Sequence, residues 1–188
     1  MTWALSQSGT KTATVAGTCT ISNASPGVIT ITNTCAANDQ VVFTTTGTLP
    51  TGLTAGTTYF VISAGLSSSV FEVSATLGGA AINTSSAGSG THTATIEHLL
   101  ATDTNNGTFV CETDTSNMAL SDLVEFRIYT ITLSGGALVQ AWKWPFQNVQ
   151  INNHKLFPPV ASDQSIKFMV KQLAGTGRAF AWKMLRVS

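Results

Sequence analysis

Two pairs of acidic residues are spaced closely enough to act together on one substrate. Glu112 and Asp114 are two residues apart, and Asp122 and Glu125 are three apart. Glycoside hydrolysis needs two carboxyl groups that converge on one bond, one of them as a proton donor. Turn-forming residues flank both pairs, and nothing near them marks a sugar-binding cleft. We therefore predict no catalytic residue and no enzyme, and we rank catalysis on sugar polymers last among the alternatives.

Metal and cofactor sites are not expected either. His92, His98 and His154 lack the spacing of a metal site; the first two would share one face of a strand but lie roughly 20 Å apart, so all three are predicted to be ordinary surface histidines. Residues 103–107 with Glu112 resemble a calcium loop, but the glycine and the glutamate stand at the fifth and tenth positions rather than at the sixth and twelfth. No nucleotide-binding or nucleophile-elbow motif occurs.

Three cysteines are too few for a disulfide-rich scaffold. Cys19 and Cys35 bracket a segment whose Ser25-Pro26-Gly27 turn would fold two strands back on each other. A disulfide between them could form, whereas two buried thiols are favoured if the protein stays in reducing cytosol. Cys111 is expected to be a lone strand residue.

Charge is distributed unevenly along the chain. Up to Glu125 a single base, Lys11, stands against eight acids, and from Phe126 onward eight bases stand against one acid, Asp163. The basic residues are spaced along strands, so docking on an acidic protein surface or on neighbouring copies is favoured over nucleic-acid binding. The candidate interface residues are Arg127, Trp142, Lys143, Trp144, Lys155, Lys167, Lys171 and Arg178.

The two tryptophans of this set lie in the segment Trp142-Lys143-Trp144-Pro145-Phe146. In a strand both indoles share one face and Lys143 lies on the other. Such indoles could stack sugars or bases, but a groove for nucleic acid would need several aromatic residues among clustered bases. A place in the core is favoured for one tryptophan, and a subunit interface is the next alternative.

Short apolar runs separated by Gly, Pro, Ser and Asn clusters should position these residues on strands. Charged residues make up only 10% of the 188 residues, and almost no helix is expected. Residues 123–133 and 164–173 alternate apolar with polar side chains, and Asn105-Asn106-Gly107 predicts a hairpin. Seven or eight such strands predict an all-β fold, an antiparallel, jelly-roll-like β-sandwich.

A repeated phrase indicates how the chain is divided. Residues 9–15 read GTKTATV and residues 90–96 read GTHTATI, with five of seven positions identical. The flanking segments do not match, which favours a join over an internal repeat, because insertions are tolerated at exposed turns. We predict a host β-sandwich from 1–16 and 95–188, with a small β domain inserted at 17–94.

The insert resembles a module of tailed-bacteriophage tail-fibre, spike and virion-surface proteins. Residues 43–93 contain TGTLPTGLTAGTTYFVI, then SATLGGAAIN, then GSGTHT, in the order found in that module. The host, over residues 107–183 and in its MTW start, resembles a family of small tailed-phage virion proteins that form one β-sandwich. The carrying segments are GTFVCETDTSNM, DLVEFRIYT and IKFMVKQLAGTGRAFAWK.

These resemblances imply a structural virion protein without a catalytic site. The small size favours a capsid decoration or cement protein, which would bind the major capsid protein through the host and project the insert outward. Association with copies of itself, as a trimer, is expected because sandwich edges need cover. No signal peptide is visible, so we expect synthesis in the bacterial cytoplasm and a place on the virion surface. The alternative is a tail or receptor-binding spike component that contacts host-surface glycans.

Overall fold

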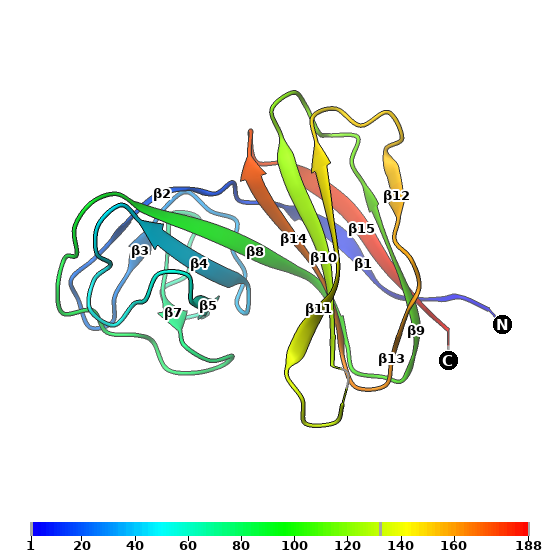
Figure 1. Ribbon diagram of the computed structural model, residues 1–188, viewed down its shortest axis with the longest axis horizontal. Coiled ribbons are helices and arrows are strands. Elements are labelled where there is room, and N and C mark those ends of the chain that lie inside the picture. Colours follow the sequence, from blue (N-terminus) through cyan, green and yellow to red (C-terminus); the bar gives the residue numbers. More distant parts are fainter. Residues whose placement is uncertain (1, 132, 188) are drawn as a thin grey trace. The chain divides into compact units, whose positions relative to one another are not determined.

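The computed structural model describes residues 2–131 and 133–187, and it confirms an all-β fold with antiparallel sheets (Figure 1). Strands make up 51% of the chain, and the described residues form no helix, so none of these segments offers a helix able to cross a membrane. The strands are β1 (Ala4–Thr12), β2 (Gly17–Ile21), β3 (Ile29–Thr30), β4 (Gln40–Thr45), β5 (Thr58–Val61), β6 (Val70–Phe71), β7 (Val73–Ser74), β8 (His92–Asp103), β9 (Gly107–Asp114), β10 (Leu123–Ile131), β11 (Leu138–Gln147), β12 (His154–Leu156), β13 (Val160–Ser162), β14 (Ile166–Ala174) and β15 (Ala179–Val187).

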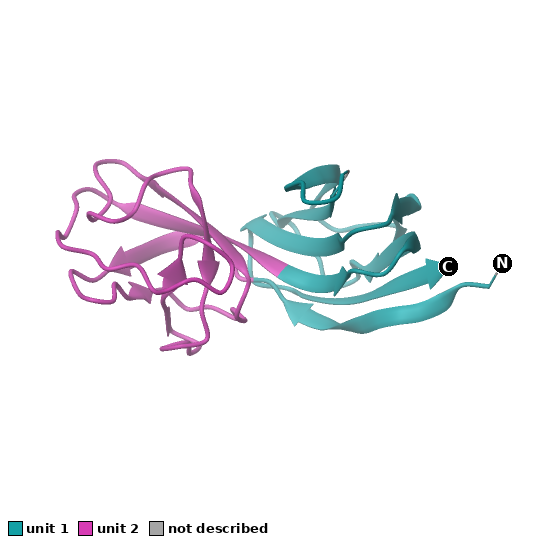
Figure 2. Ribbon diagram, turned by 90° about the horizontal axis from the view of Figure 1, so that it is seen from below, with its two compact units in different colours: residues 1–13, 99–188 teal, residues 14–98 magenta. Residues whose placement is uncertain are grey.

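The chain divides into two compact units, each with its own apolar core. Unit 1 comprises residues 1–13 and 99–188, and unit 2 comprises residues 14–98 (Figure 2). The boundaries expected from the repeated phrase, at 16 and 95, fall within four residues of these. The acquisition of the second unit by insertion stays a prediction.

Unit 1 is built from two antiparallel sheets. One has the strand order β1-β15-β9-β12, with β13 also paired to β9, and the other has the order β11-β10-β14-β8. Side chains from both sheets form its core around Phe126 of β10. The Phe126 ring lies 5.4 Å from Phe180 of β15, edge to face, and 5.8 Å from Phe168 of β14, stacked. Such aromatic pairs hold the two sheets in one arrangement.

The predicted hairpin at Asn105-Asn106-Gly107 is wrong, because this turn carries the chain from one sheet to the other. β8 and β9, which flank the turn, belong to different sheets. Gly107 is packed so tightly that an added Cβ would lie 2.7 Å from the Val187 carbonyl oxygen. An Asn-Gly step permits a tight turn, but packing of Gly107 against β15 sends the next strand into the other sheet.

A β-bulge in β1 links the two sheets along one side of unit 1. The register with β15 shifts between Leu5 and Gln7, so consecutive side chains of β1 can both reach β8. Gln7 donates to the Thr102 carbonyl oxygen at 2.7 Å and accepts from its amide at 3.2 Å, and the Ser6 hydroxyl donates to Asp103 at 2.6 Å. The Gln7 side-chain amide therefore satisfies both backbone groups of Thr102 in β8, as a paired strand would.

Unit 2 contains β2 to β7 and the first part of β8, which pairs with β2 and β4. Its core includes Phe43 and Tyr59, whose ring centroids lie 6.0 Å apart. The unit begins and ends at neighbouring points: the Thr14 amide donates to Nε2 of His98 at 2.8 Å. Nδ1 of the same ring lies 2.6 Å from Asp39 Oδ2, and neither side chain is exposed to solvent.

Candidate functional site

Four of the predicted interface residues lie together on one face of unit 1. Val124, Phe126 and Ile128 of β10 point into the core, so the residues between them lie on the opposite face of the sheet, where Glu125 and Arg127 are nevertheless largely shielded from water. Cross-strand neighbours share a face, and the register places Lys143 opposite Arg127, Lys171 opposite Glu125 and Lys167 opposite Tyr129. We call this set the basic face, and its members are Glu125, Arg127, Tyr129, Lys143, Lys167 and Lys171.

Glu125 lies at the centre of three of the four cations. Arg127 donates to it through Nε at 3.1 Å and through a terminal nitrogen, while Nζ of Lys143 and Nζ of Lys171 each lie 3.8 Å from its carboxylate. The remaining terminal nitrogen of Arg127 donates to the Tyr129 hydroxyl at 3.3 Å. With Lys167, which does not contact Glu125, the four cations and the one carboxylate of this set give a net charge of +3.

The protonation of Glu125 follows from these contacts. Burial by itself would raise the pKa of Glu125, but the hydrogen bond and charge of Arg127, then the charges of Lys171 and Lys143, outweigh it and hold this pKa below its usual value. Glu125 is therefore ionised at neutral pH, and it fixes the positions of its cations.

Lys167 differs from the other three cations in its contacts rather than in its burial, since the side chains of Arg127 and Lys171 are only 16% and 17% exposed. It is half-buried on β14, opposite Tyr129, and burial lowers the pKa of its ammonium group. Among the residues that the structure describes, no hydrogen-bond or ion-pair partner is found for its side chain. Lys167 is thus a cation that the fold partly removes from water without a counter-charge.

The other predicted interface residues do not join the basic face. Trp142 and Trp144 lie on the opposite side of β11: Trp144 packs 4.6 Å from Phe157 of the core, and Trp142, 46% exposed, stacks on Trp144 at 5.5 Å. Lys155 of β12 lies over the Phe146 ring at 5.0 Å. Trp144 is partly buried and packs against the core without being one of its buried members, so the core position expected for one tryptophan of the pair is reached only in part.

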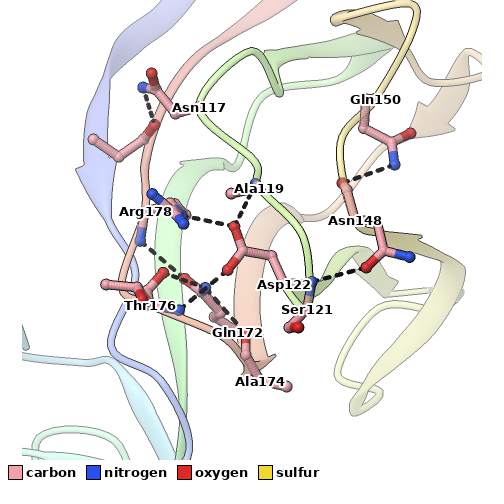
Figure 3. Close-up of polar contacts among 11 residues, drawn as sticks. Asn117, Ala119, Ser121, Asp122, Asn148, Gln150, Gln172, Ala174, Thr176 and Arg178 are labelled. Carbon is pink, nitrogen blue, oxygen red and sulfur yellow. Dashed lines mark hydrogen bonds and ion pairs between the residues drawn. The ribbon is translucent and has the colours of Figure 1, made fainter.

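Arg178 lies in a polar cluster at the loops, where it binds Asp122 (Figure 3). The Asp122 carboxylate, fully buried, accepts from the Ala119 amide at 2.7 Å, from Nε of Arg178 at 2.7 Å and from the Thr176 amide at 3.1 Å. Gly175 has φ +91° and lies so close that an added Cβ would be 1.9 Å from Asp122 Oδ1. Only glycine fits there.

Buried Gln172 completes this cluster from β14. Its side-chain amide donates to the Thr176 carbonyl oxygen at 2.6 Å, and its oxygen accepts from the Arg178 amide at 3.0 Å. Sequence reasoning missed the Asp122–Arg178 pair because 56 positions separate its members. The Gly-rich turn before Arg178 was the one available signal.

Three of the four carboxylates considered for catalysis, Glu112, Asp122 and Glu125, are held in ion pairs. Burial would raise the pKa of Asp122, but hydrogen bonds from Ala119, Arg178 and Thr176 lower it overall. Burial would likewise raise the pKa of Glu112, but Lys183, at 3.0 Å, and His154, at 2.7 Å, bring it below its usual value. A proton donor for glycoside cleavage needs a raised pKa, so this geometry does not favour these groups as acids.

The prediction of surface histidines is wrong for two of the three. His92 and His98 are buried, and only His154 is exposed. A histidine can be buried when both ring nitrogens form hydrogen bonds. Those of His98 do so, Nδ1 with the Asp39 carboxylate and Nε2 with the Thr14 amide. Within residues 2–131 and 133–187, no three His, Cys, Asp or Glu side chains gather as a metal site requires.

The suggested disulfide between Cys19 and Cys35 is absent: both residues are thiols, as is Cys111. Burial raises the pKa of Cys19 to about 11, and it raises that of Cys111 further. Cys35 is partly buried and packs against the unit 2 core, whereas Cys19 is buried within the core of unit 2 and Cys111 within that of unit 1. These two groups stay protonated at neutral pH and behave as small apolar residues.

Many of the unevenly distributed charges of the sequence form ion pairs with each other inside unit 1. Acids from the middle of the chain pair with bases near its end, as Asp103 does with Arg186, Glu112 with Lys183 and Asp122 with Arg178. Unit 1 holds nine Lys and Arg against six Asp and Glu, a net +3, while unit 2 holds three acids and no base, a net −3. The basic face carries the surplus of unit 1.

Comparisons of the chain with models of known protein families, with curated proteins and with solved structures found no match.

Proposed function

We propose that this chain is a non-enzymatic structural protein of a tailed-phage particle, a capsid decoration or cement protein on the virion surface. The basic face carries the proposal: Arg127, Lys143, Lys167 and Lys171 lie on one face of three neighbouring strands, and all but Lys167 contact the Glu125 carboxylate. A sheet holds such charges rigidly, which suits attachment to an acidic surface of the major capsid protein. The resemblance of residues 107–183 to small phage virion proteins supports the particle as the place of action.

A protein partner suits this face better than nucleic acid. The ionised Glu125 at its centre would repel a phosphate backbone, and Tyr129 is its single aromatic side chain. Grooves that bind single strands instead combine several stacking aromatics with many bases. The lowered pKa values of Asp122 and Glu112 support a role without catalysis.

The proposal is tested by binding the purified chain to particles that lack it, with co-sedimentation as the measurement. Lys143→Gln/Lys171→Gln removes two charges from the basic face, and Lys155→Gln/Lys183→Gln removes the same two charges from β12 and β15 of the other sheet. We expect the first variant to bind about tenfold or more weakly and the second within about threefold of the parent chain. Equal losses in both variants would contradict attachment through this face.

A tail or receptor-binding spike component that contacts host-surface glycans is the second candidate. One observation favours it: Trp142 is 46% exposed and is held flat against Trp144. Rigid exposed indoles bind apolar faces of ligands at small entropic cost. Binding to a glycan array that Trp142→Ala abolishes would favour this candidate over attachment to the capsid.

A further inference from the structure

We propose that Lys167 is the residue of the basic face that receives a carboxylate from the acidic partner, and that it determines the strength of attachment. This inference rests on the proposed function and makes it more specific. It assigns different roles to cations that look equivalent in the sequence.

The four cations of the basic face fall into two groups. Arg127, Lys143 and Lys171 all bind Glu125, so their charges are partly satisfied within the chain. Lys167 pairs with Tyr129, two cross-strand pairs along the same face from Glu125 and Lys171, and among the described residues it has no counter-charge. Glu125 holds the first group in place, so Lys167 is the cation that remains able to bind a carboxylate of the partner protein.

Burial makes this difference matter for binding. An ammonium group that is partly removed from water without a partner destabilises the fold that holds it. A carboxylate from another protein would supply the missing charge where water is already reduced, and partly desolvated contacts of this kind carry most of the energy of an interface. A well-exposed lysine such as Lys143 already lies near the Glu125 carboxylate. A new ion pair to the partner would therefore contribute less binding free energy at Lys143 than at Lys167.

The inference is tested with Lys167→Met and the matched variant Lys143→Met, each measured for particle binding and for thermal unfolding. We expect Lys167→Met to weaken binding about tenfold or more, and Lys143→Met to weaken it by less than about threefold. The Tm of Lys167→Met should equal or exceed that of the parent chain, because the variant removes a poorly solvated charge. Lys167→Arg, which keeps the charge, should retain most of the binding.

Each other outcome has a distinct meaning. Equal, small losses in the two methionine variants would overturn the role of Lys167 and leave the proposed function standing, whereas no loss even in Lys143→Gln/Lys171→Gln would remove the proposed function itself. A Tm that falls together with binding in Lys167→Met would show a structural role and overturn the inference. Release of the chain from particles by duplex DNA, but not by poly-glutamate of equal charge, would overturn the carboxylate partner in favour of phosphate.

Discussion

Asp122 shows how a single carboxylate can organise the loops at one end of unit 1. It precedes β10, and its partners come from its own connection, through Ala119, and from the turn between β14 and β15, through Thr176 and Arg178. A buried charge is tolerated only when hydrogen bonds satisfy it. Removing the charge should therefore cost far more than an exposed substitution would.

We predict a pH-dependent effect for Asp122→Asn. At pH 7 the variant leaves Arg178 without its carboxylate and should lower the free energy of unfolding by about 3–5 kcal/mol, measured by urea denaturation. The folded pKa of Asp122 lies below its usual value, so its contribution is complete above the unfolded pKa of about 4 and is lost as the pH falls through the lower folded pKa. The difference between parent and variant should therefore shrink below about pH 4.

The exposed Asp163 provides the control for this experiment. Asp163→Asn should change the free energy of unfolding by less than about 0.5 kcal/mol at every pH. A loss in Asp122→Asn that is the same at pH 7 and pH 3 would contradict the ionised state of Asp122 in the folded protein.

β11 is the edge strand of its sheet, and it carries two indoles with different surroundings. Trp144 contacts Phe157 and packs against the core, whereas Trp142 is stacked on the outer side of Trp144. Pro145, on the same strand, lacks an amide hydrogen and so limits pairing with another strand. The strand therefore combines a core contact with a protected, partly aromatic edge.

Alanine substitutions should separate these two contributions. We expect Trp144→Ala to lower the free energy of unfolding by about 3 kcal/mol or more, because it opens a cavity next to Phe157. Trp142→Ala should cost about 1 kcal/mol, since much of its ring is already in contact with water. Chemical denaturation followed by far-UV circular dichroism measures both, and equal losses would show that the stacked pair behaves as one packing unit.

Some of these elements could be predicted from the sequence, and others depend on contacts that no local pattern encodes. The alternation in β10 and β14 identified the inward residues, such as Phe126 and Phe168, and thereby the outward ones. The register that brings Lys143 and Lys171 to Glu125 is a long-range property. The short strands β12 and β13 have no period to detect, and the burial of His98 depends on Asp39, which is 59 positions away.

The two units differ in charge as well as in core. Unit 2 contains no Lys or Arg, and two of its three acids, Asp39 and Glu97, are buried. Its surface is therefore dominated by hydroxyl and amide groups, and charged contacts of the protein concentrate in unit 1. Under the proposed function, attachment depends on unit 1, and unit 2 contributes a nearly uncharged surface.

We predict that a core substitution in unit 2 separates the unfolding of the two units. Phe43 is fully buried against Tyr59, so Phe43→Ala should destabilise unit 2 by about 3–5 kcal/mol. All four tryptophans lie in unit 1, and tryptophan fluorescence therefore follows that unit alone. The circular dichroism of the variant should change at a lower temperature than its fluorescence, whereas coincident transitions would show a single cooperative unit.

The hydrogen bond between Thr14 and His98 joins the first and last residues of unit 2. A segment whose two ends touch can be exchanged for another sequence without stretching the polypeptide that carries it. Any foreign domain with adjacent termini therefore meets the geometric requirement for replacing residues 14–98. The same junction that makes unit 2 self-contained makes the chain a ready carrier for displaying chosen antigens or enzymes.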